Sequence, residues 1–208
     1  MKHYSDNEDV NLQLKNISLW KLSQDQAESL EVALSEKEVR EAVYDCKGNK
    51  APGPGGFNFN FIKAKWQLLK KEFLEFLEDF QKSCTFSRSV NASFLTLVRK
   101  REAAEDLGDY RLICLIRCIY KVLAKVLANR LKSVLQYVVS EHQTAFIKGR
   151  QILVSIIFAK EILDYMAKRR EGGLVLKLDF EKAFDSVKWR FLDEVMKLIQ
   201  WLFQHGNQ

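Results

Sequence analysis

The sequence predicts an α+β fold that is mostly helical. Apolar residues recur at helical spacing over several long stretches, and three shorter segments have the apolar character of strands. The 208 residues include only two prolines and nine glycines, which favours long regular elements. With 47% hydrophobic and 29% charged residues, the composition is that of a globular protein.

In the first part of the chain, a helix, a loop and a second helix are expected in that order. Residues 1–34 are polar and weakly patterned, which indicates a lead-in or linker. A helix is predicted after them, because Ser35 can cap it and Glu38 stands three residues further on, as in a capping box. Residues 47–56, KGNKAPGPGG, hold both prolines and predict a loop. Apolar spacing then predicts an amphipathic helix over residues 61–82.

A β-hairpin and three more helices are expected next. Residues 91–100 and 110–116 are apolar runs separated by a polar turn, so charges are expected at the hairpin tip. Glu-Gly-Gly at 171–173 is expected to end the second of the helices. The helices themselves are predicted over residues 118–139, 152–169 and 186–203.

The segment LVLKLDFEKAFDSVKW, residues 174–189, carries the clearest chemical signal. Its alternating leucines predict a half-buried strand, from which Lys177 and Asp179 point to the other face. Asp185 has a structural explanation, because it or Ser186 can cap the next helix. Asp179 has none, and a carboxylate at the end of a strand is a common ligand of Mg²⁺. Taken alone, this one residue makes metal binding a hypothesis only.

The net charge of +6 makes an acidic polymer such as nucleic acid a reasonable partner, with a membrane surface or plain solubility as alternatives. Arg117, Lys121 and Lys125 share one face of a predicted helix, because they are spaced by four residues. A solvated helix face is the other interpretation of this spacing. The further residues expected to form one positive wall with them are Arg99, Lys100, Arg101, Arg111, Arg130 and Lys132.

Several classes of protein are disfavoured. The four cysteines form no C-x-x-C pair, so we expect buried reduced thiols rather than a zinc site. The N-terminal residues lack an apolar signal segment, and no stretch approaches about 18 uninterrupted apolar residues. We therefore expect an intracellular protein, in the nucleus or cytoplasm, without a signal peptide, a transmembrane segment or a membrane partner.

The segment GLVLKLDFEKAFDSVKWRFLD, residues 173–193, is the last of five blocks that occur in series; the others are residues 35–66, 91–100, 109–135 and 141–152. Together they resemble the reverse transcriptase domain of non-LTR (LINE-type) retrotransposons, in a plant-like form. The resemblance covers residues 35 to about 195, and the last block resembles the first catalytic block of that family.

The resemblance implies a right-hand polymerase, of which this chain holds only part. Residues 35–208 are then a truncated reverse transcriptase domain, with the fingers over residues 35–170 and the first palm strand and helix over residues 171–208. The implied partners are an RNA template, a DNA primer and deoxynucleoside triphosphates, and the implied cofactor is Mg²⁺.

Family roles transfer by position. Asp179 corresponds to the first catalytic, metal-binding carboxylate, with the carbonyl of Phe180 beside it. Phe184 corresponds to the bulky residue that excludes a ribose 2′-hydroxyl. Lys100 and Arg111 correspond to finger positions that hold the incoming triphosphate. The residues expected near template and primer are Gln143, Gly149 and Arg150, together with the basic helix positions Arg117, Lys121 and Lys125.

Three positions depart from the family pattern. Gly55 stands where an aspartate that could cap the next helix is usual. Arg99 and Leu112 each replace a proline, so a looser hairpin tip is expected.

The 208 residues contain no Asp-Asp sequence, whereas two-metal catalysis needs more carboxylates than Asp179 alone. We therefore expect this truncated RNA-directed DNA polymerase to be inactive alone, since the second catalytic block and the thumb are absent. Two alternatives stay open, a non-catalytic nucleic-acid-binding remnant and an unstable, pseudogene-like product.

Overall fold

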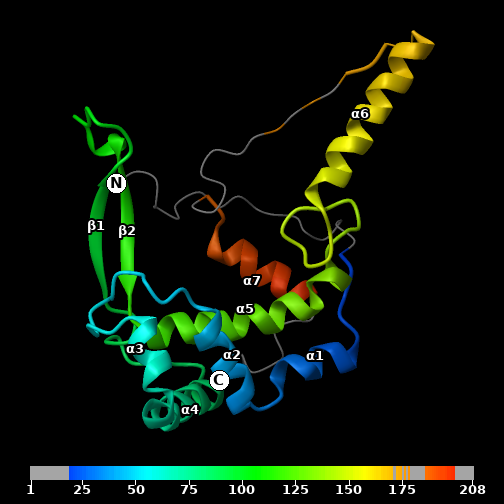
Figure 1. The fold of residues 1–208 in the computed structure, drawn as a ribbon. Helices are drawn as coiled ribbons and strands as arrows, with labels where there is room; N and C mark the ends of the chain where they lie inside the picture. Colours follow the sequence, from blue (N-terminus) through cyan, green and yellow to red (C-terminus); the bar gives the residue numbers. More distant parts are fainter. Residues whose placement is uncertain (1–18, 171, 175, 177, 179–185, 200–208) are drawn as a thin grey trace. The chain divides into compact units, whose positions relative to one another are not determined.

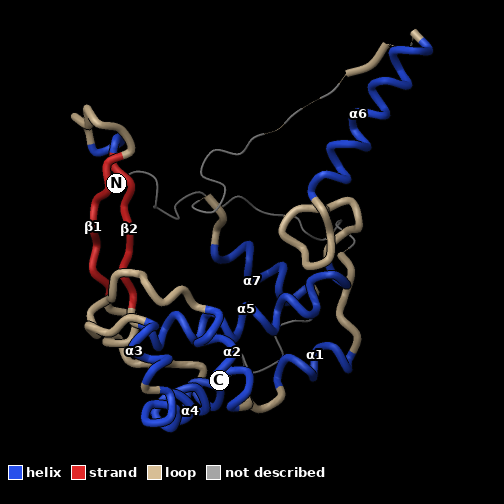
Figure 2. Tube along the Cα trace, in the orientation of Figure 1, coloured by secondary structure: helices blue, strands red, loops and turns tan. Residues whose placement is uncertain are grey.

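The computed structural model describes residues 19–170, 172–174, 176, 178 and 186–199. The chain divides into two compact units, one of residues 32–131 and one of residues 1–31 with 132–208. Among the described residues, helices predominate and the strands form one two-stranded sheet (Figure 2). The predicted α+β, mostly helical class is therefore confirmed at this level.

Residues 32–131 combine a group of helices with one hairpin (Figure 1). The elements in chain order are α2 (Glu36–Asp45), α3 (Phe59–Ala64), α4 (Trp66–Ser83), β1 (Ser93–Arg99), the 3-10 helix η2 (Leu107–Asp109), β2 (Tyr110–Ile116) and the first part of α5 (Cys118–Val138).

The core of this unit is built by α2, α3, α4 and α5. In α2 the side chains of Val39 and Val43 are fully buried, and in α5 so are those of Val122 and Val126. Each pair is spaced by four residues, the spacing at which a helix presents one face. Burial of a side chain of this kind stabilises the fold by about 1.5–3 kcal/mol. The apolar periodicity of the sequence is therefore what assembles the helices.

The start of α2 is a complete capping box, as predicted. The backbone N–H of Glu38 donates to Oγ of Ser35 at 3.2 Å, and the N–H of Ser35 donates to Oε2 of Glu38 at 3.0 Å. Two N–H groups that the first helical turn leaves without helical partners are thereby satisfied.

The single helix predicted over residues 61–82 is two helices in the structure. The chain leaves helical geometry at Lys65, where ψ is 20°, between α3 and α4. Neither proline nor glycine marks this position, so the sequence holds no local signal of the break. The side chain of Asn58 caps α3 by accepting from the N–H of Phe61 at 3.1 Å. Asn58 thus caps the helix that follows the loop, although Gly55 stands where a capping aspartate is usual.

The predicted hairpin is confirmed. β1 and β2 pair antiparallel, with Ser93 opposite Ile116 and Arg99 opposite Tyr110. Every residue of β1 is exposed, and in Figure 1 the hairpin projects from the helices of its unit. Apolar side chains on both of its faces are uncovered, among them Phe94 and Leu97.

The other unit contains α1 (Gln24–Glu31), the end of α5, α6 (Ile152–Arg169) and α7 (Trp189–Leu198). Helix α1 lies in a segment that the sequence indicated only as a lead-in. The N–H of Leu22, just before α1, donates to the carbonyl of Ile199 at 3.2 Å. Both of these side chains are buried, so the segment before α1 is packed rather than free.

Helix α6 has the predicted bounds but ends differently. Its last turn closes at Arg170, which has φ 54°, so the left-handed position expected at the glycines is occupied by an arginine. Nearly all residues of α6 are exposed, including the apolar Ile156 and Phe158.

The half-buried strand predicted from residue 174 is not observed at the residues that the structure describes there. Leu174, Leu176 and Leu178 are 92%, 73% and 67% exposed and belong to no strand. A strand needs a neighbour to satisfy its backbone hydrogen bonds, and the described strands β1 and β2 pair with each other. Periodicity alone was therefore insufficient at this position.

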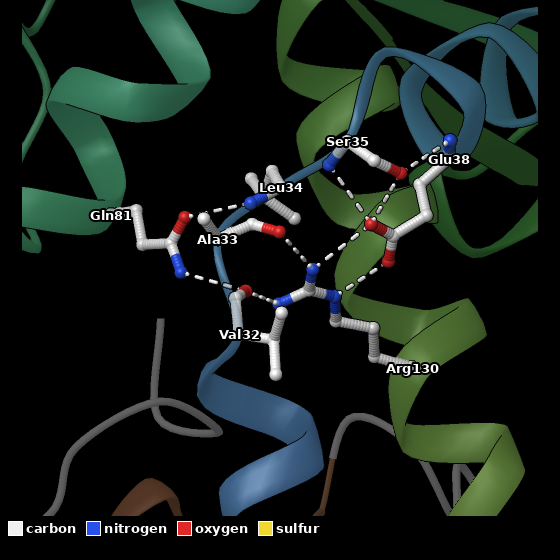
Figure 3. Close-up of polar contacts among 7 residues, drawn as sticks. All are labelled: Val32, Ala33, Leu34, Ser35, Glu38, Gln81 and Arg130. Carbon is white, nitrogen blue, oxygen red and sulfur yellow. Dashed lines mark hydrogen bonds and ion pairs between the residues drawn. The ribbon is translucent and has the colours of Figure 1, made fainter.

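The guanidinium of Arg130, in α5, is the centre of a polar cluster at the start of α2 (Figure 3). It donates from Nε to Oε1 of Glu38 at 2.8 Å and from Nη2 to Oε2 at 3.0 Å. It also donates to the carbonyls of Val32 at 2.6 Å and Ala33 at 3.3 Å. The Arg130 side chain is only 12% exposed, so these bonds replace most of its hydration.

Helix α4 holds the same segment through Gln81. The Gln81 side chain accepts from the N–H of Leu34 at 3.1 Å and donates to the carbonyl of Val32 at 3.0 Å (Figure 3). The irregular chain before α2 is thus hydrogen-bonded to α4 and to α5, which satisfies two of its carbonyls and one N–H group.

Replacing Arg130 with methionine is expected to destabilise the fold by about 2 kcal/mol, because the Glu38 carboxylate and two carbonyls lose their donors. We choose the lower part of the usual range because Glu38 is 35% exposed and solvent screens its charge. Urea unfolding measures the change. In the control, Glu36→Gln, removal of the exposed Lys70–Glu36 pair should cost less than about 0.5 kcal/mol.

The same pair predicts an acid dependence. Arg130 lowers the pKa of Glu38 from 4.5 to about 2, so the carboxylate stabilises the folded state fully above pH 4.5. This contribution is lost as the pH falls from 4.5 towards 2. The stability difference between the wild type and Arg130→Met should shrink over this window, and a difference independent of pH would contradict the pairing.

Candidate nucleotide and nucleic-acid interface

The predicted site residues fall into three groups in the structure. Asp179, Phe180 and Phe184 lie outside the described residues. The hairpin carries the predicted triphosphate ligands, and the start of α5 carries the basic helix positions. The third group lies in the loop between α5 and α6. No cluster of three or more His, Cys, Asp or Glu side chains that could hold a metal is found in the part of the chain described.

Lys100 and Arg111 lie near the tip end of the hairpin. Arg111 is in β2 and pairs with Val98, so the side chains of these two residues share a face. Lys100 directly follows β1, and its N–H donates to the carbonyl of Asp109 at 2.7 Å, so the two chains are still hydrogen-bonded there. The hairpin thus holds both cations within a short stretch of its tip end.

The ammonium of Lys100 already has a partner at the tip. Its Nζ donates to the carbonyl of Gly108 at 2.7 Å. Arg111 is exposed and has no side-chain partner among the residues described. A bound anion would thus be a second partner for the ammonium of Lys100. For the guanidinium of Arg111 it would be the first side-chain partner among the described residues.

Asp109 orders the hairpin tip, and the sequence did not single it out. Its Oδ2 accepts from Nη2 of Arg101 at 2.7 Å and from the N–H groups of Glu105 and Asp106 at 3.1 and 3.3 Å. The Arg101 bond and these two N–H groups lower the pKa of Asp109. The tip has Arg99 and Leu112 in place of two prolines, and the carboxylate of Asp109 holds its backbone instead. In the sequence, the only indication of this contact is that Asp109 follows Arg101 by eight residues, across the predicted turn.

The base of the hairpin is seated on the APGPGG loop. A Cβ on Gly53 would lie 2.4 Å from the carbonyl oxygen of Ile116, so the two backbones touch directly. Next to this contact, Sγ of Cys118 donates to the carbonyl of Phe57 at 3.1 Å. Only glycine permits this approach at position 53. By contrast, a Cβ on Gly55 would meet nothing within 4 Å.

The basic positions predicted for one helix face differ in their surroundings, and Arg117 lies one residue before the start of α5 rather than within it. Nε of Arg117 is buried without a hydrogen-bond partner in the described structure. Nζ of Lys125 lies 3.5 Å from Oδ2 of Asp45, whereas Lys121 has no ion-pair partner among the described residues. Arg130 is engaged with Glu38. The wall predicted from the sequence is therefore partly neutralised within the chain.

The cysteines match their prediction only in part. Cys46 and Cys118 are half-buried, and burial raises the pKa of both thiols. Cys84 and Cys114 are exposed, so the expectation of buried thiols is wrong for these two. All four cysteines are free.

Arg150 caps the end of α5 and folds the loop that follows. Its guanidinium donates to four backbone carbonyls, those of Gln136, Val139, Ser140 and Gln143. A cation at this position satisfies the last carbonyls of the helix and interacts favourably with the helix dipole.

Gln143 and Gly149 also shape this loop. Nε2 of Gln143 donates to the carbonyl of Ala145 at 3.2 Å. Gly149 has φ 83°, the left-handed region that favours glycine. Local structure thus accounts for the residue types at Gln143, Gly149 and Arg150.

Comparisons with known proteins identify the family of the chain. Residues 98–203, just over half of the chain, match the family model described as reverse transcriptase (RNA-dependent DNA polymerase), so the chain belongs to that family. The match begins in the hairpin and includes the segment around Asp179.

Two relatives come from transposable elements. The chain is 29% identical over 171 residues to the transposon TX1 uncharacterized 149 kDa protein of Xenopus laevis, covering 82% of this chain and 13% of that protein. It is also 29% identical over 168 residues to the retrovirus-related Pol polyprotein from type-1 retrotransposable element R1 of Bradysia coprophila, covering 77% and 16%. The chain thus spans a small part of the length of either relative. No helix in the described structure has the length and apolarity needed to cross a membrane.

Replacing Gly53 with alanine is expected to destabilise the fold by about 2–3 kcal/mol, because the added Cβ would overlap the carbonyl of Ile116. The matched control is Gly55→Ala, where space is open and φ is not positive, and it should be neutral or slightly stabilising. Urea unfolding compares the two. Equal effects would show that the hairpin is not seated on Gly53.

Replacing Asp109 with asparagine is expected to speed amide exchange at Glu105 and Asp106, whose N–H groups lose a charged acceptor. Hydrogen–deuterium exchange with mass spectrometry measures it over residues 100–109. Glu102→Gln, at an exposed position of the same tip, is the control. Unchanged exchange in Asp109→Asn would mean that the tip is ordered by other contacts.

Proposed function

We propose that the chain is the fingers and the start of the palm of an RNA-directed DNA polymerase from a non-LTR (LINE-type) retrotransposon of plant-like type. The observation that carries this proposal is the joint position of Lys100 and Arg111. Both lie within the segment that matches the family, Arg111 in β2 and Lys100 directly after β1, where its N–H is hydrogen-bonded to Asp109. Two cations close together in one hairpin suit a triphosphate, since phosphoryl transfer depends on charge neutralisation and positioning.

The same proposal assigns each part of the chain to a polymerase subdomain. The fingers comprise residues 35–170, and the palm begins at residue 171. Contacts to the RNA template and the DNA primer are proposed for the loop after α5 and, separately, for Lys121. The proposed role of Phe184 is to exclude a ribose 2′-hydroxyl from the incoming deoxynucleoside triphosphate.

Asp179, with the carbonyl of Phe180, is the proposed Mg²⁺ ligand of the polymerase. Bound Mg²⁺ supplies charge neutralisation at the transferred phosphoryl group. Because two-metal chemistry needs more than one carboxylate and the 208 residues contain no Asp-Asp sequence, we propose that they do not extend a primer by themselves. What they retain in isolation is binding of nucleic acid and nucleotide.

The test is a chimera in which residues 35–195 of this chain replace the matching segment of the R1 Pol polyprotein. The chimera is expected to extend a DNA primer on an RNA template with Mg²⁺, and Asp179→Ala should abolish extension. Asp185→Ala, the matched control, should mainly lower stability. A chimera that folds but never extends, beside an active R1 parent, would contradict the polymerase assignment.

In the same chimera, Lys100→Ala with Arg111→Ala is expected to raise the KM for deoxynucleoside triphosphate on the order of 100-fold, since two charged contacts of about 1.5 kcal/mol each contribute about 3 kcal/mol together. The control pair is Lys47→Ala with Lys50→Ala, in the loop before α3. A fall in kcat with an unchanged KM would show that Lys100 and Arg111 do not bind the triphosphate.

A further inference from the structure

Phe146, in the loop between α5 and α6, is exposed to an unusual degree. Its side chain is 95% exposed, more than any other large apolar residue in the described structure. Its backbone has φ 63°, the left-handed region that bulky side chains rarely adopt. The chain thus bears a conformational cost at a residue that buries almost nothing, and strain of this kind is concentrated at functional positions.

The loop that holds Phe146 is firmly braced. The four carbonyl contacts of Arg150 fix its beginning. Oγ1 of Thr144 and Oγ of Ser155 are hydrogen-bonded at 2.7 Å, which ties the loop to α6. The N–H of Arg150 donates to the carbonyl of Ile147 at 3.1 Å, which closes a turn after the phenylalanine. The ring is therefore presented on a fixed scaffold.

Phe146 also differs from the other exposed apolar residues of its unit. Phe158 belongs to a continuous exposed face of α6, where Ile157 and Ile162 lie along the same helix. Phe146 stands apart, because its neighbours Ala145 and Ile147 are partly buried. A single exposed ring on a rigid loop does not have the extent of a protein-docking surface.

The chemistry around the ring favours nucleic acid. Lys148 is exposed two residues further on, although Glu141 and His142 are exposed at the start of the loop. Unpaired bases stack on aromatic rings while cations nearby in the chain hold the backbone electrostatically. The guanidinium of Arg150 is occupied by carbonyls, so Lys148 is the cation of this loop whose side chain is exposed close in sequence to the ring.

We propose that Phe146 is a stacking platform for an unpaired base of the single-stranded template or primer. This inference rests on the proposed function and adds a positioning residue to it. The roles expected earlier for Gln143, Gly149 and Arg150 then become those of a scaffold that presents the ring.

The experiment measures binding of the full chain to a single-stranded RNA containing 2-aminopurine, by fluorescence anisotropy and by quenching of the base. Phe146→Ala should weaken binding about 5- to 100-fold and remove the quenching, as loss of one stacked base does. Phe146→Trp should retain both, whereas Phe146→Leu, which keeps apolarity without a π-face, should behave like alanine. Phe158→Ala is the matched control and should bind as the wild type does.

The outcomes separate the two proposals. If the wild-type chain binds no single-stranded RNA at low salt, the nucleic-acid role fails and this inference fails with it. If the wild type binds and Phe146→Ala is indistinguishable from it, only the stacking role is overturned. Full retention by Phe146→Leu also overturns it, because the contact is then apolar packing, as against another protein segment. Thermal unfolding checks that the variants fold, which the exposure of the ring leads us to expect.

Discussion

The fold of residues 32–131 depends on the largely enclosed guanidinium of Arg130, whose side chain is 12% exposed. Arg130 brings together the irregular segment before α2, the capping box of α2 and the middle of α5, which lie far apart in the sequence. Apolar burial by Val39 and Val122 assembles the helices, but it does not define where the chain enters them. The hydrogen bonds from Arg130 to the Val32 and Ala33 carbonyls and to Glu38 fix that entry, because bonds from a charged donor are stronger than neutral ones.

The same use of cations recurs elsewhere in the chain. Arg150 donates to the carbonyls that end α5, and Lys100 donates to the carbonyl of Gly108 at the hairpin tip. The guanidinium groups of Arg130 and Arg150 are therefore occupied within the chain, whereas the ammonium of Lys100 keeps donors for a further partner. Arg111 and Lys121 have no ion-pair partner among the described residues. Their charges can therefore neutralise phosphates without first breaking an ion pair within the chain.

Local signals of the sequence predicted most of the elements. Ser35 and Glu38 marked the start of α2, two apolar runs separated by a polar turn marked the hairpin, and α6 was predicted with the observed bounds. The break at Lys65 was missed because no proline or glycine accompanies it. The strand at Leu174 was not found because a strand depends on a partner elsewhere in the chain. Asp109 and Phe146 were missed since their roles follow from three-dimensional contacts and backbone conformation, which periodicity does not report.

Photo-crosslinking with mass spectrometry tests the location of the interface most directly. The reagents are the full chain and an RNA–DNA template–primer carrying photoreactive bases and phosphates, at low and at high salt. We predict salt-sensitive crosslinks in the hairpin, residues 93–116, and in the loop of residues 140–151. Crosslinks confined to α4 or α7, with none in either of these segments, would contradict the proposed interface.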